Sequence, residues 1–273
     1  MNLIQKNKLK ELSIAIPIYH LENEVFVKDC LDSIYPISEE VAEIIIVFDG
    51  ISENLKKIVH SYNFSSLKII TNRNPKGLAC VLNQMINSCK TRYMRRIDAD
   101  DILVSQELKS QFHFMTLNQL NICGSYAIIL NNQQEVGMYR KLDTRNLPFT
   151  TLITPPFIHP TVILDVEYMN SYSLRYPCEN EYVKSVMFED WYLWNLFRKS
   201  GAKSGNYNKP TLYYRIKDVE RQFNRFKASI KEKKKLINQM ALNKHEIILA
   251  KLILNILSIL KPVIRKLYHL KYS

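Results

Sequence analysis

Glycine is scarce in this sequence, with only six residues in a chain of 273. The sequence contains neither the GxGxxG fingerprint of dinucleotide-binding domains nor the GxxxxGK[ST] loop of P-loop proteins. Both devices need glycine so that backbone amides can approach a phosphate closely. The shortage therefore argues against an NAD-type dehydrogenase and a P-loop NTPase. A metal-held diphosphate remains the natural way for such a chain to bind a nucleotide.

The sequence also lacks cysteine pairs with metal-binding spacing and a recognisable export signal. Its five cysteines form no CxxC motif. The apolar run near the N-terminus is short, follows several lysines and has no small-residue cleavage site. An odd number of cysteines without an export signal predicts reduced thiols, most of them buried in the core. The chain is accordingly expected in the cytoplasm.

Acidic residues are few near the C-terminus. Residues 216–273 hold 14 Lys/Arg and 4 Asp/Glu, a net charge of +10 out of +12 for the whole chain, which leaves +2 for the first 215 residues. Hydrophobic residues make up 47% of the chain, enough for a real core. We therefore expect one near-neutral folded domain over residues 1–216 and a basic tail over residues 217–273 that meets an anionic surface.

The spacing of polar residues between positions 244 and 269 predicts an apolar helix with a narrow polar stripe in this tail. Lys251 interrupts the apolar run and Pro262 should kink or break it, so a membrane-spanning helix is not expected. Flanking lysine clusters favour a helix that lies in a membrane interface with anionic lipid. A helix packed on the domain or at a homodimer interface is the alternative. The high apolar content argues against nucleic acid as a partner.

Short apolar runs alternate with helical patterns in the first hundred residues. Strands are predicted at 12–19, 43–49, 67–71 and 92–98, and the apolar spacing from Leu78 to Cys89 predicts a helix. This alternation is typical of a mostly parallel sheet with helices on both faces. Later elements are predicted as a hairpin at 121–140, strands at 157–164 and 211–216, and a helix from Glu189 that ends at Gly201.

Polar residues follow each predicted parallel strand. They are Tyr19-His20, Asp49-Gly50, Asn72-Arg73 and Asp98 to Asp101. Ligands of open α/β sheets bind beyond the carboxyl ends of the strands. We therefore expect these residues, which lie far apart in the sequence, to converge on one crevice.

Three carboxylates crowd the end of the fourth strand, in the stretch "RRIDADD". Alternate side chains of an extended strand share a face, so Asp98 and Asp100 are expected to point the same way. Oxygen ligands in this position suit Mg²⁺ or Mn²⁺, with water and ligand phosphates completing the coordination. Asp101 is expected to begin the next helix, and a solvated acidic turn is the alternative for the whole cluster.

These motifs together resemble those of the family 2 glycosyltransferases. The stretches "SIAIPIYHLENEVFVKDCLDSI", "EIIIVFDG", "NPKGLACVLNQMI" and "RRIDADD" are similar to the family's opening strand and helix, second strand, following helix and metal motif. The stretches "PFIHPTVIL", "FEDWYLWNLFRKSG" and "LYYR" resemble its acceptor-side strand, ED-containing helix and closing strand. The resemblance covers residues 12–216 in the family's order. It departs from the family at Phe48, where an acid is usual.

The resemblance implies a GT-A fold, which is a Rossmann-like α/β fold for nucleotide sugars with a mostly parallel central sheet, here with a C-terminal helical extension. It implies an inverting, metal-dependent enzyme that moves a sugar from a nucleotide sugar to a hydroxyl of a glycan or lipid-linked acceptor. UDP is the expected nucleotide. The motif spellings are similar to bacterial members that build lipopolysaccharide, capsule or exopolysaccharide, which implies a peripheral protein on the inner face of the cytoplasmic membrane.

The same resemblance assigns roles to individual residues. Asp190 is the expected catalytic base, Asp100 and Asp98 the metal ligands, and Asp49 the residue that hydrogen-bonds uracil. The residues expected on the donor side are Pro17, Tyr19, Asp49, Arg73, Lys76, Arg96 and Asp98, and those expected on the acceptor side are His159, Glu189 and Trp191. Sugar transfer needs a base for the acceptor hydroxyl and stabilisation of the departing diphosphate, and this set contains candidates for both.

Other interpretations stay open at this point. A nucleotidyltransferase also uses acids and a metal, but its Gly/Lys-rich signature loop is missing. Phe48 leaves room for a catalytically degenerate sugar-nucleotide-binding or membrane scaffold protein, although the presence of Asp100 together with Asp190 argues against it. Taken alone, Asp190 fits a first-turn acid that complements the helix dipole, and the alternative for Trp191 is a core residue.

Overall fold

The computed structural model describes residues 8–131, 133–141, 151, 155–179, 188–216, 234, 237–238 and 243–256. Within these residues the strands are β1 (Leu12–Tyr19), β2 (Glu43–Asp49), β3 (Leu67–Asn72), β4 (Tyr93–Arg96), β5 (Ile102–Leu103), β6 (Ile122–Asn131), β7 (Gln134–Tyr139), β8 (Ile163–Asp165) and β9 (Ser204–Ile216). The α-helices are α2 (Glu24–Ile34), α3 (Glu53–His60), α4 (Leu78–Ser88), α5 (Ser105–Leu117), α6 (Val166–Ser171) and α8 (Glu189–Lys199), with 3₁₀ turns η1 (Lys8–Glu11), η2 (Tyr35–Ile37) and η4 (His159–Thr161). Residues 244–256 form a further helix.

The described strands form one nine-stranded sheet in the order β3-β2-β1-β4-β8-β6-β9-β5, with β7 paired to β6. β1 to β4 are mutually parallel neighbours, as the alternating sequence pattern predicts. β8 then runs antiparallel to β4 and β6, and β5 runs antiparallel to β9. The sheet is therefore parallel in its first half, which aligns the carboxyl ends of four strands, and mixed in its second half.

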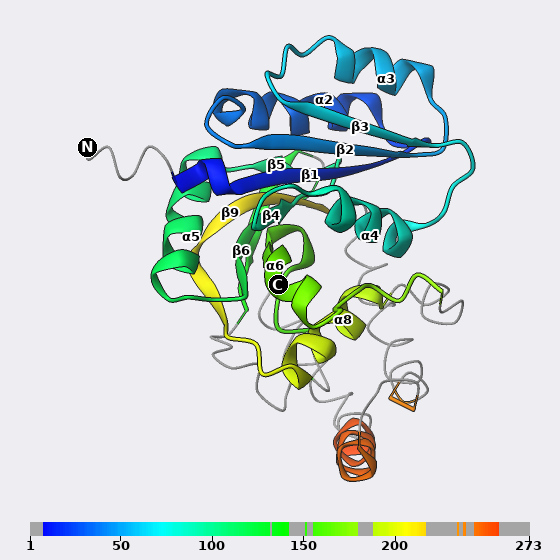
Figure 1. The fold of residues 1–273 in the computed structure, drawn as a ribbon, viewed down its shortest axis with the longest axis vertical. Coiled ribbons are helices and arrows are strands. Elements are labelled where there is room, and N and C mark those ends of the chain that lie inside the picture. Colours follow the sequence, from blue (N-terminus) through cyan, green and yellow to red (C-terminus); the bar gives the residue numbers. More distant parts are fainter. Residues whose placement is uncertain are drawn as a thin grey trace.

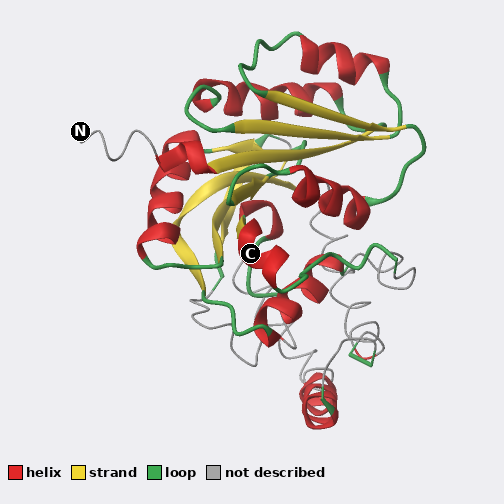
Figure 2. Cartoon of the chain, in the orientation of Figure 1, coloured by secondary structure: helices red, strands yellow, loops and turns green. Residues whose placement is uncertain are grey.

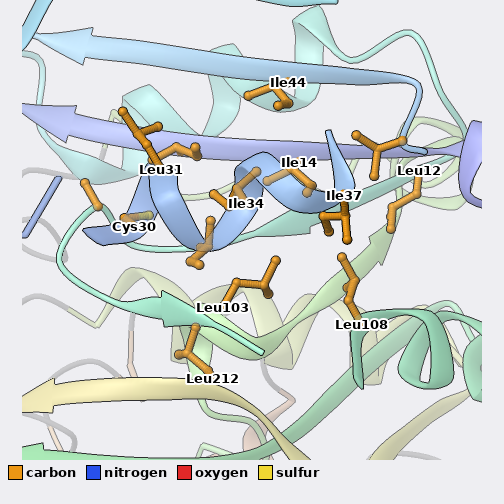
Figure 3. Close-up of a cluster of buried hydrophobic side chains, with 14 of the residues drawn as sticks. Leu12, Ile14, Cys30, Leu31, Ile34, Ile37, Ile44, Leu103, Leu108 and Leu212 are labelled. Atoms are coloured by element: carbon orange, nitrogen blue, oxygen red, sulfur yellow. The ribbon is translucent and has the colours of Figure 1, made fainter. Parts of the chain in front are cut away.

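Helices cover the parallel half of the sheet on both faces, with α2 and α3 on one side and α4 on the other (Figures 1 and 2). Ile14, Ile16 and Ile18 of β1 belong to the core cluster that contains residues of α2, α3 and α5. Ala15 between them belongs to the second cluster, with residues of α4, α6 and α8. This division follows from the two-residue period of a strand. Figure 3 shows the first cluster, where α2 packs on β1 and β2.

The predicted elements are mostly confirmed. The four parallel strands, the hairpin of β6 and β7 and helix α8 are present, and the strand predicted at 211–216 is the second half of the longer β9. The strand predicted at 157–164 is wrong over its first part, where Pro160 lies in the 3₁₀ turn η4, and β8 begins only at Ile163. Proline fits such a turn because it donates no backbone hydrogen bond.

The prediction of reduced thiols is wrong for two of the cysteines. Cys80 of α4 and Cys178, 98 residues later, form a disulfide. Cys30, Cys89 and Cys123 are free, and Cys30 and Cys123 are buried as predicted. The pairing was invisible in the sequence because it depends on the fold, which brings the chain segment after α6 alongside α4.

Candidate active site

The polar residues that end the parallel strands meet at one edge of the sheet. Tyr19 is the register partner of Asp49, and Asp49 is the register partner of Asn72. The exposed fraction of Tyr19 is 45%, whereas Asp49 is buried. The convergence predicted from the sequence is therefore confirmed for these three strands.

The carboxylate of Asp49 anchors the loop that precedes α4. Its Oδ1 accepts a hydrogen bond from the backbone N–H of Lys76 at 2.7 Å, and its Oδ2 accepts one from the backbone N–H of Gly77 at 2.9 Å. The side-chain amide of Asn72 also donates to Oδ1, at 3.4 Å. This structural role was not predicted from the sequence. Contact between Asp49 and a uracil base stays a prediction.

His20 and Gly50 pack tightly at the same edge. Nδ1 of His20 lies 3.1 Å from the carbonyl oxygen of Asp49. A Cβ atom on Gly50 would lie 2.5 Å from the His20 ring, and the φ angle of Gly50 is +102°. Glycine is therefore required at this turn both for space and for backbone conformation.

The three acids after β4 lie on a turn and not on a strand. β4 ends at Arg96, and the backbone N–H of Asp101 donates to the carbonyl of Asp98 at 3.2 Å. The prediction that Asp98 and Asp100 alternate along a strand is therefore wrong. Their carboxylates nevertheless lie close together. One carboxylate oxygen from each of Asp98, Asp100 and Asp101 lies within 4.8 Å of the others.

Arg215, near the end of β9, fastens this turn. Its backbone N–H donates to Oδ1 of Asp101 at 2.9 Å, and its Nη1 donates to the carbonyl of Asp100 at 2.9 Å. Its Nη2 forms an ion pair with Asp29 of α2 at 2.5 Å. The guanidinium also lies over the ring of Phe26, 4.3 Å from the centroid. Asp101 is therefore a buried acceptor for β9, and the expectation that it begins a helix is wrong because α5 starts at Ser105.

Arg96 is the buried cation next to the acidic turn. Its exposed fraction is 1%, and it forms an ion pair with Asp98. Burial raises the pKa of Asp98 to about 6, an effect that Arg96 opposes and the Asp100 charge strengthens. The expectation that Arg96 contacts a donor directly is corrected by its burial, because the side chain offers almost no surface to a ligand. Its ion pair instead holds Asp98.

The first turn of α8 brings two further acids to the site. Burial, reinforced by the charge of Asp190, raises the pKa of Glu189 to about 7. Oδ1 of Asp190 accepts a hydrogen bond from the backbone N–H of Trp191 at 2.7 Å. Trp191 itself has an exposed fraction of 0%, and its Nε1 donates to the carbonyl of Thr151 at 2.7 Å. The expectation that Trp191 contacts a sugar is corrected, since a fully buried indole presents no face for stacking.

His159 and Tyr176 connect the two groups of acids. Nε2 of His159 lies 2.9 Å from the hydroxyl of Tyr176. Burial lowers the pKa of His159 well below its usual value, and the charge of Arg96 adds to this effect. Charges of Arg96, Asp190, Glu189 and Asp98 all act on the pKa of Tyr176, which burial raises above its usual range. The acidic turn after β4 and the start of α8 are therefore both close enough to Tyr176 for their charges to act on it.

Sequence reasoning missed Tyr176, Asp29 and the contribution of Arg215 to the acidic turn. Asp29 lies inside an amphipathic helix and Tyr176 in a segment without a motif, so nothing in their local pattern marks them. Two predicted donor-side residues, Arg73 and Lys76, have exposed side chains in the loop after β3, and Pro17 is half-buried in β1. Contacts of these residues with a donor stay predictions.

The sequence model described as "Glycosyl transferase family 2" matches residues 13–170. This chain belongs to that family. The fold agrees, because the α/β sheet with its acidic turn after the fourth parallel strand is a GT-A fold. The nucleotidyltransferase interpretation is thereby set aside, and the chain is a glycosyltransferase by family.

Curated relatives share about a quarter of the sequence. The UDP-Glc:alpha-D-GlcNAc-diphosphoundecaprenol beta-1,3-glucosyltransferase WfgD of Escherichia coli is 26% identical over 219 residues, which cover 79% of this chain and 81% of the relative. A UDP-Gal:alpha-D-GlcNAc-diphosphoundecaprenol beta-1,3-galactosyltransferase, also of Escherichia coli, is 25% identical over 243 residues, which cover 80% and 84%.

Solved structures share the fold at lower identity. The crystal structure of S. aureus TarS in complex with UDP has a TM-score of 0.63 and 17% identity, and covers 88% of this chain and 69% of that chain. The mannosyltransferase PcManGT of Pyrobaculum calidifontis, in complex with GDP-Man and Mn²⁺, has a TM-score of 0.64 and 11% identity, and covers 89% and 69%. Identities this low show the fold alone.

Proposed function

We propose that this glycosyltransferase moves a sugar from a UDP-sugar to a hydroxyl of a GlcNAc-diphosphate lipid during bacterial surface-polysaccharide synthesis. The observation that carries the proposal is the acidic turn Asp98–Asp101, which stands beside the strand ends of Tyr19 and Asp49. The named activities of the two Escherichia coli relatives support the choice of UDP and of a lipid-linked acceptor.

A divalent cation fits the acidic turn. The turn offers three carboxylates within 4.8 Å, and Oδ2 of Asp101 is buried without a hydrogen-bond partner among the described residues. Carboxylates this close repel one another, and Mg²⁺ or Mn²⁺ is the kind of ion that relieves the repulsion. We assign Asp100 and Asp98 as its ligands. The bound ion would stabilise the negative charge that grows on the departing diphosphate.

The chain's own residues divide the remaining work. Asp49 holds the loop at Lys76 and Gly77 in place, so this loop and Tyr19 form the donor edge of the site. Asp190 takes the proton from the acceptor hydroxyl, which then attacks the sugar from the face opposite the leaving group and inverts its anomeric centre. Its hydrogen bond from the Trp191 amide holds the carboxylate at the start of α8.

The acceptor is proposed to approach through a hollow of about 1340 Å³ between α4, residues 173–179 and α8. Tyr192 and the amides of Asn83, Gln84 and Asn87 line this hollow, to which the buried Tyr176 contributes almost no exposed surface. Aromatic rings and amides suit sugar hydroxyls and ring faces. Tyr192 and the proposed base Asp190 both lie in the first turns of α8.

A transfer assay tests this function. The purified full chain is incubated with UDP-Glc, UDP-Gal or UDP-GlcNAc, Mn²⁺ and a short-chain GlcNAc-diphosphate lipid, and products are identified by mass spectrometry. We expect one UDP-sugar to give a lipid product heavier by one sugar unit, with the new linkage in the β configuration. The degenerate-protein alternative predicts UDP binding without product from any donor, and that outcome would overturn the proposal.

We further propose that residues 1–216 are the catalytic domain and that the tail, residues 217–273, binds the inner face of the cytoplasmic membrane. Within the described residues, none of the helices has the length and apolar character needed to cross a membrane. The described tail helix exposes Ile248, Leu249, Leu252 and Ile256, each more than 40% exposed. These positions share one helix face, and the lysine-rich flanks would favour anionic lipid.

The tail helix is also tied to the domain, through the ion pair of Arg198 in α8 with Glu246 at 2.7 Å. A vesicle flotation assay separates membrane binding from simple packing or homodimerisation. The full chain is expected to float with vesicles that contain anionic phosphatidylglycerol and to stay behind with neutral phosphatidylcholine. Changing Ile248 and Leu252 to Ser should abolish flotation. The tail would be excluded as a lipid anchor if the variant floats as well as the parent protein, or if the parent protein does not float.

A further inference from the structure

The chain segment after α6 is fastened to α4 at two points. The side-chain amide of Asn83 donates to the carbonyl of Tyr176 at 2.8 Å and its oxygen accepts from the backbone N–H of Tyr176 at 2.9 Å. One turn earlier on α4, Cys80 forms the disulfide with Cys178. The two anchors sit three residues apart on the helix and two apart on the segment, where the backbone N–H of Cys178 donates to the carbonyl of Tyr176 at 2.8 Å. Together they fix the backbone of Tyr176 on both sides.

We call Cys80, Asn83 and Cys178 the latch. The side chain of Tyr176 extends from this latch toward His159. It is 2% exposed, and its hydroxyl contacts Nε2 of His159 at 2.9 Å. The other side of the His159 ring is bounded by Trp194, whose ring meets it edge-on at 5.6 Å. Burial keeps both the phenol and the imidazole neutral. The phenol hydroxyl can donate to Nε2 or accept from it, so this hydrogen bond fixes the orientation of the histidine ring in either tautomer.

We propose that Tyr176 is a positioning residue, which fixes the ring of the acceptor-side candidate His159 and is itself held by the latch, so that sugar transfer slows when the Cys80–Cys178 disulfide is reduced. The inference rests on the proposed function for the identity of the acceptor side. The wall that carries Tyr176 also lines the acceptor hollow. Release of the latch would therefore disturb His159 and the acceptor wall together. Cys80 also donates its backbone N–H to the carbonyl of Gly77, so the latch adjoins the loop that Asp49 anchors.

A purely structural role for Tyr176 makes a different prediction. Its ring belongs to the core cluster that contains Leu193, Trp194 and Phe197, and a Tyr176→Phe substitution leaves this packing intact while removing only the hydroxyl. If packing is its whole function, the Phe variant keeps full activity. If the hydroxyl positions His159, the variant folds normally but turns over slowly.

The first experiment compares Tyr176→Phe with Tyr172→Phe, a control on an exposed tyrosine of the same region. We expect kcat of Tyr176→Phe to fall about tenfold, the effect of one lost hydrogen bond, with the donor KM unchanged. The ¹⁵N signals of the His159 ring should shift in this variant alone, because Nε2 loses its hydrogen-bond partner. Unchanged kcat with unchanged ring signals would overturn the positioning role.

The second experiment tests the latch with a dithiol reductant. Dithiothreitol gives two electrons to the disulfide, which takes up two protons to become two thiols, while the reductant closes to a cyclic disulfide. Alkylation after denaturation should label three cysteines in the untreated protein and five after reduction. We expect reduction to lower kcat of the parent protein at least threefold, because the acceptor wall and His159 lose the hold of the latch.

The Cys80→Ser/Cys178→Ser double variant should already have the low kcat and should not respond to the reductant. Cys89→Ser, which removes a free cysteine, should behave as the parent protein. Full activity of the parent after five cysteines are labelled would overturn the latch. A parent protein that transfers no sugar in either redox state contradicts the proposed function instead, and the ring signals of His159 still report on the positioning contact.

Discussion

Arg215 donates its backbone N–H to the carboxylate of Asp101, although 114 residues separate them in the chain. Its side chain reaches past this contact to the Asp100 carbonyl and to Asp29. A residue of the last strand in the domain thereby sets the shape of the proposed metal turn. The turn is a product of the complete fold and not of its own sequence.

Arg215→Ala is expected to weaken Mn²⁺-dependent UDP binding about tenfold, because the substitution removes the hold on the Asp100 carbonyl and leaves the backbone contact to Asp101 in place. Isothermal titration calorimetry measures the affinity. Lys209→Ala on the same strand, which loses only an exposed ion pair with Glu107, is the matched control. Equal affinities for the two variants would show that the turn keeps its shape without Arg215.

Asp100→Asn is expected to abolish the metal-dependent part of UDP binding, because an amide is a poorer ligand for a hard divalent cation than a carboxylate. Binding is measured with Mn²⁺ and again with EDTA. Asp32→Asn, an exposed acid of α2 that accepts from Tyr62, is the control for the change of charge. If the parent protein binds UDP equally well in EDTA, the metal assignment is wrong.

Asp49→Asn is expected to destabilise the folded state by about 1–3 kcal/mol, because the amide nitrogen cannot accept the hydrogen bond from Gly77. UDP affinity should fall as well, since the loop before α4 loses its anchor. Urea unfolding gives the stability and calorimetry the affinity. Glu53→Gln, an exposed acid at the start of α3, controls for the lost charge. A variant with parental stability and affinity would remove Asp49 as the loop anchor.

Asp190→Asn is expected to keep UDP binding and lose transfer by at least about 100-fold, the usual contribution of a general base. The asparagine oxygen can still accept from the Trp191 amide, so α8 should begin as before. Product formation and UDP affinity are measured on the same preparation, with Glu167→Gln, an exposed acid of α6, as the control. Normal turnover of the asparagine variant would exclude Asp190 as the base.

Glu189 should make the protein less stable as pH rises. Its pKa is about 7 in the folded state and 4.5 in its usual environment, so the folded state binds the proton more tightly. The stability that the protonated group contributes is present below pH 4.5 and is lost as pH rises toward and through 7. Glu189→Gln should therefore be more stable than the parent at pH 8, by about 3 kcal/mol at most, and should match it near pH 4. Chemical denaturation at the two pH values measures the difference in the free energy of unfolding between variant and parent. An equal difference at both pH values would rule out this titration.

The sequence predicted the parallel half of the fold because its signals are local. Near-continuous apolar strands such as "EIIIVFD" and the apolar spacing of α4 are set by neighbours along the chain, and β2 and α4 follow them closely. The same locality explains the failure at 157–164, where β-branched residues suggested a strand and the proline in η4 decided otherwise. The polar residues at the ends of the predicted strands are also local signals, and they indicated the acidic turn and the position of Asp49 at the edge of the sheet.

Contacts between distant segments could not be predicted. The sequence by itself determined the order of strands and helices, the family motifs and the presence of carboxylates at Asp98, Asp100 and Asp190. The tertiary structure alone decided that Trp191 is buried, that Cys80 pairs with Cys178, that Arg215 fastens the acidic turn and that Tyr176 meets His159. The physical reason is that backbone propensity and amphipathic period act over a few residues, whereas burial, disulfide geometry and buried ion pairs depend on which surfaces the complete fold brings together.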